Sequence, residues 1–483
     1  MKEKYKKSKI YKVLHKTVSP KNGYLIALVV VTLFSLVCYA SYAMFTVYEE
    51  HQRVLTMQAG SIQVVMNSGA LDNNDGITVP AGEMRIFDIE LTNNATTPVK
   101  ADINYTTDNN IAVVKYVSEP DSVTPNNNGD FEIPANSKVT ATITIYNPSA
   151  SDANVTISND YGLPNANLIG ENTVLVDIAS NPFDVYNDSN ILVKKVYDTG
   201  VMKLGNKIPN GFQSNEVNGL YDYVDQYGTK TYVYRGTDVN NYVSFAGLTW
   251  RILRIQEDGT IKLVTDVGVD YLNNNFNTSY ITNNGVSRVG VLYDDSNRND
   301  IWKYRGSTVE GYVNAWYQDI MSQYSDYLVD NEYCSDEYTD TNSWGVHNQW
   351  SPFVPLYGVR NRVEKNSNNE FEWTPSITCV SGDRITAKAA LITGDEYILL
   401  GGGEGNMSNY FVNFTYWTMS PEGINTDLNN DQGDAYYVSY DGGLYQDVIK
   451  DAHKRGVRPV VTLKASIPIS GGSGTSSSPY VID

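Results

Sequence analysis

Hydrophobic and polar residues alternate along several short segments between residues 57 and 180. Residues 85–91 read Arg-Ile-Phe-Asp-Ile-Glu-Leu, and residues 139–145 read Val-Thr-Ala-Thr-Ile-Thr-Ile. Such period-two runs, separated by turns rich in Asn, Asp, Gly and Pro, are typical of β-strands with one buried face. Several strands at this spacing predict a β-sandwich domain, immunoglobulin-like in outline, over residues 57–180.

Two turns of this region have similar sequences. Val-Pro-Ala-Gly at residues 79–82 precedes one predicted strand, and Ile-Pro-Ala-Asn at residues 133–136 precedes the other. We expect each to be a turn that leads into a strand facing the core. No longer internal repeat is evident.

A hairpin is predicted early in the second half of the chain. Residues 248–255 read Leu-Thr-Trp-Arg-Ile-Leu-Arg-Ile, and another apolar run follows the turn residues Asp258 and Gly259. Two such strands around an Asp-Gly turn favour an antiparallel hairpin. Trp250 and Ile252 should share one face of it.

Two helices are expected after this hairpin. Ser307 and Glu310 form a capping-box pattern ahead of apolar residues at helical spacing. A second helix is predicted over residues 385–399, ended by three glycines at 401–403. The segment 181–219 is interrupted by Asn-Pro and Pro-Asn-Gly and reads as a connector. The expected domains are therefore the sandwich at 57–180, the connector at 181–219 and an α+β domain at 220–483.

The N-terminus carries the features of a membrane anchor. Residues 2–21 contain eight lysines and one glutamate, and residues 24–45 contain no charge. This length suits a transmembrane helix, and the lysines place residues 1–23 in the cytoplasm. A cleaved secretory signal is the alternative, with Ser-Tyr-Ala at 41–43 as its cleavage site. Both interpretations export the remainder of the chain.

The net charge of the chain limits the classes of partner that we expect. The net charge is −19, and because residues 2–21 contribute +7, the remaining residues carry −26. A surface that acidic repels nucleic acid and anionic lipid, so we expect neither as a partner.

Two of the three cysteines lie in the exported part of the chain. Cys38 falls within the apolar segment, whereas Cys334 and Cys379 are far beyond it. Export predicts a disulfide between this pair. Two free buried thiols are the alternative. A zinc site is disfavoured, since His347 is the single histidine nearby and zinc takes four ligands.

The order of motifs over residues 220–483 resembles a domain family found on surface proteins of Gram-positive gut bacteria. Its specific parts are Trp-Arg-Ile at 250–252, Trp-Thr-Met-Ser-Pro at 417–421 and Gly-Val-Arg-Pro-Val at 456–460. That family is itself similar to the C-type-lectin-like fold of sulfatase-modifying-factor proteins. The resemblance implies a compact α+β domain on a bacterial surface and a pairing of Cys334 with Cys379. It implies no activity.

An enzyme is not expected from these residues. The formylglycine-generating enzymes of the wider fold need a cysteine pair near the C-terminal strand, and no cysteine follows Cys379. No known nucleophile motif or phosphate loop is present. We predict no catalytic residues and no obligatory cofactor.

Two features could bind a ligand. Asp427, Asn429 and Asp431 place oxygen side chains at alternate positions, as calcium ligands require, although a solvated loop is the alternative. Aromatic residues flank this loop and could contact a sugar or a protein, or could simply cover the sheet. The predicted contact residues are Trp417, Tyr436, Tyr437, Tyr440 and Tyr445.

The function predicted from the sequence is adhesion or binding at the cell surface. A transmembrane anchor and a β-sandwich stalk would present a C-type-lectin-like domain to a glycan or protein ligand outside the cell. One alternative is a structural subunit of a surface fibre or matrix, assembled through strand edges. An enzyme of unrecognised type is the third hypothesis.

Overall fold

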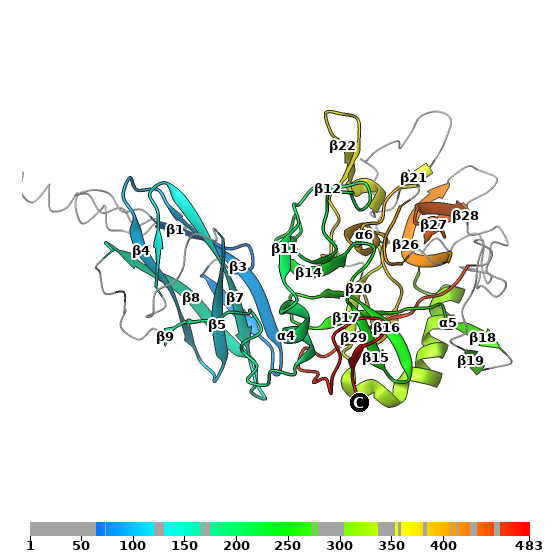
Figure 1. The fold of residues 1–483 in the computed structure, drawn as a ribbon, viewed down its shortest axis with the longest axis horizontal. Coiled ribbons are helices and arrows are strands. Elements are labelled where there is room, and N and C mark those ends of the chain that lie inside the picture. Colours follow the sequence, from blue (N-terminus) through cyan, green and yellow to red (C-terminus); the bar gives the residue numbers. More distant parts are fainter. Residues whose placement is uncertain are drawn as a thin grey trace, which may run out of the picture.

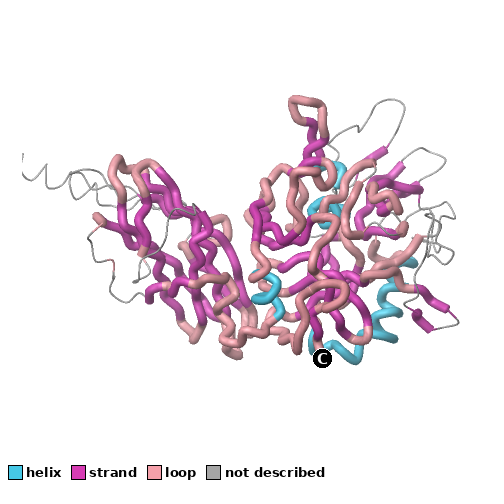
Figure 2. Tube along the Cα trace, viewed as in Figure 1, coloured by secondary structure: helices cyan, strands magenta, loops and turns pink. Residues whose placement is uncertain are grey.

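The chain folds into two bodies that lie side by side and consist mostly of β-sheet (Figures 1 and 2). The computed structural model describes residues 64–72, 74–119, 130–164, 168, 174–272, 275–277, 304–336, 353–355, 359–379, 384–405, 407–411, 414–425, 432–448 and 455–483. Within these residues no helix is both long and apolar enough to cross a bilayer. The predicted tail at 1–23 and anchor at 24–45 lie outside the described residues.

The first body, the sandwich domain, is made of two sheets with an apolar core between them. One sheet has the order β1 (Val64–Asn67), β3 (Met84–Asn93), β7 (Ser137–Tyr146), β5 (Ala112–Glu119) and β10 (Asp177–Ile178). The other has the order β2 (Gly76–Val79), β8 (Ala153–Gly162), β4 (Val99–Thr107) and β6 (Phe131–Ile133), with β9 (Val174–Leu175) also on β4. The predicted β-sandwich is confirmed.

The two similar turns of the sandwich domain occupy matching places beside β3 and β7, which pair antiparallel over their whole length. Gly82 and Asn136 both have a positive φ, and each donates its N–H to the chain just after the partner strand, at Asn147 and Ala95. The buried Asn93 amide donates to the backbone carbonyls of the turn at 133–134. The Asn147 amide does the same for the turn at 79–80. The two turns therefore have the same structure, and each is held by a buried asparagine in the same way.

The second body, the C-terminal domain, is built on a nine-stranded sheet. Its main path is β11 (Val201–Lys203), β13 (Gly219–Val224), β14 (Lys230–Arg235), β16 (Leu248–Ile255), β17 (Ile261–Thr265), β29 (Val460–Leu463) and β25 (Ala389–Ala390). β15 (Tyr242–Phe245) pairs with β16 and with β30 (Tyr480–Val481). The predicted hairpin is confirmed as β16 and β17, which pair antiparallel across Gly259.

Four smaller sheets surround this one. They are β12 (Ile208–Pro209) with β23 (Phe371–Trp373) and β22 (Val363–Lys365); β18 (Asp270–Leu272) with β19 (Asn275–Asn277); β20 (Asn331–Cys334) with β24 (Arg384–Ala387); and β21 (Phe353–Pro355) with β26 (Tyr416–Asn425), β27 (Gln432–Val438) and β28 (Leu444–Val448).

The first predicted helix is confirmed. α5 (Thr308–Trp316) begins after Ser307, whose side chain accepts a hydrogen bond from the Glu310 N–H. It continues as a π-turn, η1 (Tyr317–Met321), and a 3-10 segment, η2 (Ser322–Tyr327). The Trp316 ring packs edge-on against Trp250, which joins the helix to the central sheet.

The second predicted helix is wrong over its first half. Residues 384–390 form β24 and β25, and only α6 (Gly394–Leu399) is helical. Thr393 and Glu396 form a complete capping box that starts this helix. The edge of the sheet at β29 recruits β25 as its neighbour, and this long-range pairing overrides the local helical pattern.

The segment 181–219 is part of the C-terminal domain and not a separate connector. It contains α4 (Leu192–Tyr197), β11 and β12. Leu192, Val193 and Val196 are fully buried in the core of the C-terminal domain. A further 3-10 turn, η3 (Val359–Arg362), completes the helices of the described residues. The C-terminal domain therefore begins near residue 181.

The two domains share a packed interface. Met84 and Ile86 of β3 belong to the hydrophobic core of the C-terminal domain, and the Ile86 N–H donates to the Glu257 carbonyl over 2.8 Å. The buried Lys230 ammonium lies 2.9 Å from Asp88 of the sandwich and 2.8 Å from Asp222 of its own domain. Apolar packing thus fixes the sandwich against the tip of the β16–β17 hairpin, and the Lys230 cation joins it to the start of β14.

Candidate functional site

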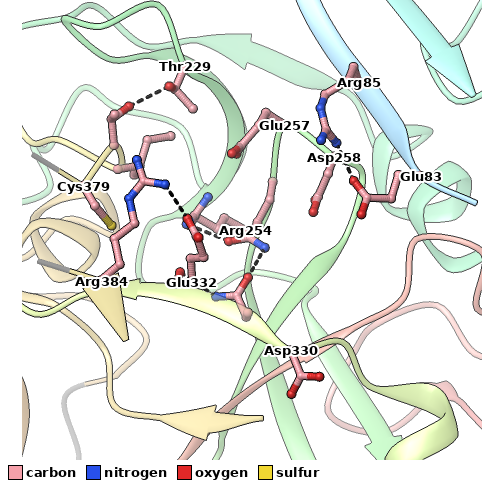
Figure 3. A pocket seen from close by; sticks show the side chains of 14 residues that line it. Glu83, Arg85, Thr229, Arg254, Glu257, Asp258, Asp330, Glu332, Cys379 and Arg384 are labelled. Atoms are coloured by element: carbon pink, nitrogen blue, oxygen red, sulfur yellow. Dashed lines mark hydrogen bonds and ion pairs between the residues drawn. The ribbon is translucent and has the colours of Figure 1, made fainter. Parts of the chain in front are cut away.

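A polar pocket of about 460 Å³ lies where the two domains meet (Figure 3). We call it the interdomain pocket. Glu83 and Arg85 contribute from the sandwich domain, and the end of β16 with its hairpin turn contributes residues 254 and 256–258. The opposite wall comes from residues 330–332 and from the segment around Cys379 and Arg384. Neither domain forms this pocket alone.

Each of the three arginines in the pocket wall already has a carboxylate partner. Arg85 lies 2.9 Å from Glu83. Arg384 lies 2.8 Å from Glu332 across the β20–β24 pair. Arg254 lies 3.0 Å from the buried Glu396 of α6. The guanidinium groups therefore stiffen the wall and offer little uncompensated positive charge to a ligand.

The hairpin turn contributes two adjacent carboxylates, Glu257 and Asp258. Asp258 accepts hydrogen bonds from the N–H and hydroxyl of Thr260, which fixes the turn. Among the described residues no lysine or arginine forms an ion pair with either carboxylate, and Figure 3 draws none. Desolvation and the neighbouring Asp258 raise the pKa of Glu257, and Arg254 and Arg85 oppose the rise. The pocket thus concentrates negative charge at the hairpin tip.

Behind the wall, hydrogen bonds fix the remaining polar groups. The Gln256 amide accepts from Arg254 and donates to Thr260 and to Asn331, over 2.7–2.9 Å. Burial opposes ionisation of Glu396, but Lys262 and Arg254 outweigh it and hold the pKa of Glu396 at about 2. Arg254, Gln256 and Glu396 are therefore held in fixed positions behind the pocket wall.

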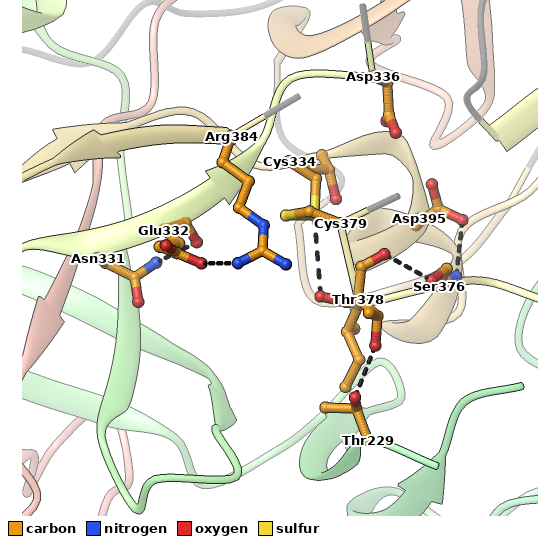
Figure 4. Close-up of a disulfide and its surroundings, with 12 residues drawn as sticks. Thr229, Asn331, Glu332, Cys334, Asp336, Ser376, Thr378, Cys379, Arg384 and Asp395 are labelled. Carbon is orange, nitrogen blue, oxygen red and sulfur yellow. Dashed lines mark hydrogen bonds and ion pairs between the residues drawn. A yellow bond between two sulfur atoms is a disulfide. The ribbon is translucent and has the colours of Figure 1, made fainter. Parts of the chain in front are cut away.

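The disulfide predicted between Cys334 and Cys379 is present at the rim of the pocket, with its two Cα atoms 4.9 Å apart (Figure 4). Cys334 ends β20, and Cys379 itself lines the pocket. The buried Asp225 carboxylate accepts the N–H groups of Ile377 and Thr378, over 3.2 and 3.0 Å. The disulfide and Asp225 together hold this edge of the pocket against the central sheet.

The predicted aromatic contact residues lie on β26, β27, β28 and the turn that joins β27 to β28. Trp417 and Tyr436 are buried in the core, whereas Tyr440 is 55% exposed. Tyr437 and Tyr445 are partly buried, with ring centres 6.0 Å apart. Arg455 stacks on Trp417 and Tyr437 and pairs with Asp447. Contact by Trp417 and Tyr436 would need these strands to open, so Tyr437, Tyr440 and Tyr445 are the three within reach of a ligand.

The predicted calcium ligands Asp427, Asn429 and Asp431 lie outside the described residues. Within the described part of the chain, no group of three or more histidine, cysteine or acidic side chains is placed to hold a metal ion.

A buried cluster of charged groups beside the disulfide escaped the sequence analysis. Arg362 binds both oxygens of Asp395, over 2.7 and 2.6 Å, and lies 3.3 Å from Asp336. The Ser420 hydroxyl donates to Asp336, and the Ser376 N–H donates to Asp395. Burial raises the pKa of Asp336 to about 7; the Arg362 cation opposes this rise, and the Asp395 charge adds to it. One cation serving two buried carboxylates leaves this cluster short of positive charge.

The residues of the interdomain pocket were also missed, because they come from five separate segments. The sequence did place Asp258 and Gly259 in a hairpin turn, but nothing in it shows that this turn contacts another domain. The adjacent acids Glu257 and Asp258 at a predicted turn were the available signal, and such pairs are usually only solvated.

No known protein-family model matches this chain, and no curated protein is similar to it in sequence. The functional argument therefore rests on the geometry of the pocket.

Proposed function

We propose that this protein is a membrane-anchored binding protein that takes up its ligand outside the cell, in the interdomain pocket. The observation that carries the proposal is a pocket of about 460 Å³ to which both domains contribute and whose polar walls are fixed by ion pairs. This volume is in the range of small-molecule and short-peptide sites. Fixed polar groups reduce the entropy lost on binding. The mechanism is non-covalent recognition.

Export of the chain is supported by the disulfide, since disulfides persist in oxidising compartments. The uncharged segment at 24–45 after a lysine-rich tail supports an anchor with the bulk of the protein outside. For the fold, we propose an immunoglobulin-like sandwich and a C-type-lectin-like C-terminal domain of a bacterial surface protein. The two-sheet architecture supports the first, and the motif order along residues 220–483 supports the second.

An adhesive surface on the aromatic strands is a second proposal. Its support is the exposed Tyr440 beside the Tyr437–Tyr445 ring pair, a combination that suits contact with sugars or proteins. This surface belongs to the small sheet of β26–β28, whereas the interdomain pocket lies at the sandwich. The protein can therefore use the two sites independently.

The pocket can be tested by blocking it. Asp330 lies on the pocket rim with its side chain 64% exposed, so Asp330→Trp places a large ring over the opening. We expect this variant to lose binding of any ligand found by thermal-shift screening of the full chain. Asp326→Trp, at an exposed position outside the pocket lining, is the matched control. A ligand that binds both variants as it binds the unmodified protein would refute the pocket as the binding site.

A further inference from the structure

The charges lining the interdomain pocket do not balance. Five carboxylates and three guanidinium groups line it, and each guanidinium is committed to a carboxylate at 2.8–3.0 Å. Arg85 forms an ion pair with Glu83, and Arg384 forms one with Glu332. Arg254 forms an ion pair with Glu396, which lies behind the pocket wall. The excess charge facing the pocket is therefore negative, although three arginines are present.

The remaining carboxylates show where this negative charge is concentrated. Asp330 has the Lys388 ammonium 3.5 Å away at the exposed rim. Glu257 and Asp258 stand next to each other on the hairpin turn, with no ion pair to a described lysine or arginine. The Ile86–Glu257 backbone hydrogen bond and the packing of Met84 hold the turn against the sandwich. The backbone of the turn is therefore fixed, while the Glu257 side chain is exposed and that of Asp258 is partly buried.

We propose that the ligand of this pocket carries a cationic nitrogen group, an alkylammonium or a guanidinium, that binds between Glu257 and Asp258. This inference rests on the proposed pocket function and names its ligand class. The source of the cation is a free amine or a lysine or arginine side chain of a peptide, which present the same chemistry. A pocket of about 460 Å³ holds such a chain with room for its neighbouring groups.

Two further observations agree with an organic cation. No metal-ligating group of three or more side chains occurs in the described residues, whereas a cationic nitrogen needs only the two carboxylates and nearby acceptors. Desolvation and the Asp258 charge raise the pKa of Glu257 more than Arg254 and Arg85 lower it, which agrees with an excess of negative charge in the pocket. A bound cation would lower that pKa, so binding should release protons and should weaken as the pH falls.

The test is calorimetric titration of the full chain with charge-matched probes. The probes are cadaverine, acetyl-Ala-Lys-Ala-amide, the same peptide with an acetylated lysine, and acetyl-Ala-Glu-Ala-amide. We expect a positively charged probe to bind and the two others to bind at least tenfold more weakly, because a hydrogen bond to a charged group is lost or repelled. Cadaverine binding alone would identify a free amine, and peptide binding would identify a basic side chain.

Glu257→Gln and Asp258→Asn keep the shape of the turn and remove one charge each. Each should weaken the cationic probe about 10- to 100-fold, because each removes one charged hydrogen-bond partner. Glu132→Gln removes a charge from an exposed position on β6 and should leave affinity unchanged. The proposal would be overturned if Glu257→Gln and Asp258→Asn bound the cationic probe as tightly as the unmodified protein does. It would also be overturned if the acetylated peptide bound as tightly as the peptide with a free lysine. If the anionic probe binds and Asp330→Trp blocks its binding, the pocket is a binding site but its ligand is not a cation. If no probe of any charge binds, both the pocket function and the cationic ligand are refuted.

Discussion

The sandwich domain and the C-terminal domain differ in how they bury polar groups. In the sandwich, β3 alternates buried and less buried residues, and the buried Asn93 and Asn147 satisfy turn carbonyls. In the C-terminal domain, strand β14 is buried at every position and includes Lys230 and Arg235. Arginines there stack on aromatic rings and bind carboxylates deep in the core. The sandwich also buries an ion pair, between Lys115 and Asp102, whereas the C-terminal domain buries several. The alternating pattern therefore identifies the sandwich from the sequence, but it does not show which charged residues of the C-terminal domain are buried.

The largest expected effect of a single change concerns the buried Arg362. Arg362→Met leaves Asp336 and Asp395 buried without their cation, which should cost about 3–5 kcal/mol of unfolding free energy. Urea unfolding followed by tryptophan fluorescence reports on this domain alone, because all seven tryptophans lie at residue 250 or later. Arg384→Met removes an exposed pair and should cost no more than about 1 kcal/mol. Equal losses in the two variants would show that the buried ion pairs of Arg362 contribute no more to stability than an exposed ion pair of the same domain.

The second prediction concerns pH. The pKa of Asp336 is raised from 3.8 to about 7 in the folded protein, so the native state binds more protons than the unfolded chain between these values. The unfolding free energy should therefore fall as pH rises from about 4 to about 7, by at most about 4 kcal/mol. Asp336→Asn should remove most of this slope, and Asp326→Asn at an exposed position should not. Parallel pH profiles for the wild type and Asp336→Asn would contradict the assignment.

A medium effect is expected at the two turn asparagines of the sandwich. The amide of Asn93 donates to Thr97, Ile133 and Pro134, and that of Asn147 to Val79, Pro80 and Ser151. Asn93→Ala and Asn147→Ala should each cost about 2–3 kcal/mol, since buried carbonyls lose their donors.

Circular dichroism during urea unfolding will measure both of these variants. Because the two turns are equivalent, the losses should agree within about 1 kcal/mol. A large loss of unfolding free energy in one variant and none in the other would show that the asparagine amide stabilises only one of the two turns.

The smallest expected effect is at the contact between the domains. Gly259 has φ +75°, and an added Cβ would lie 2.7 Å from Met84 Sδ. Gly259→Ala should cost about 1–2 kcal/mol, chiefly from the backbone conformation, because the end of the methionine side chain can shift. Gly247→Ala, at φ +72° with nothing within 4 Å, isolates the backbone cost. In calorimetry, only Gly259→Ala should separate the unfolding of the two domains into two transitions. A single transition in both variants would show that the contact between Gly259 and Met84 does not couple the unfolding of the two domains.

The sequence by itself determined much of the local structure. Alternation predicted β3 and β7, the Asp-Gly turn predicted the β16–β17 hairpin, and Ser307 predicted the start of α5. Two cysteines in the part of the chain expected to be exported predicted the disulfide. Each of these features is specified by neighbours in the chain or by the chemistry of one residue type, so one sequence is enough to find it.

Tertiary structure decided the rest, for a physical reason that recurs across the molecule. Residues 384–387 became a strand by pairing with β20, and residues 389–390 by pairing with β29. Residues 181–219 joined the C-terminal domain because Leu192 and Val193 fill its core. The interdomain pocket and the Arg362 cluster draw charged residues from segments far apart in sequence. A charged side chain is expected in water until its partner is known. Only the folded chain brings Glu257 against the sandwich and Asp336 beside Arg362, and so decides which charges form ion pairs and which do not.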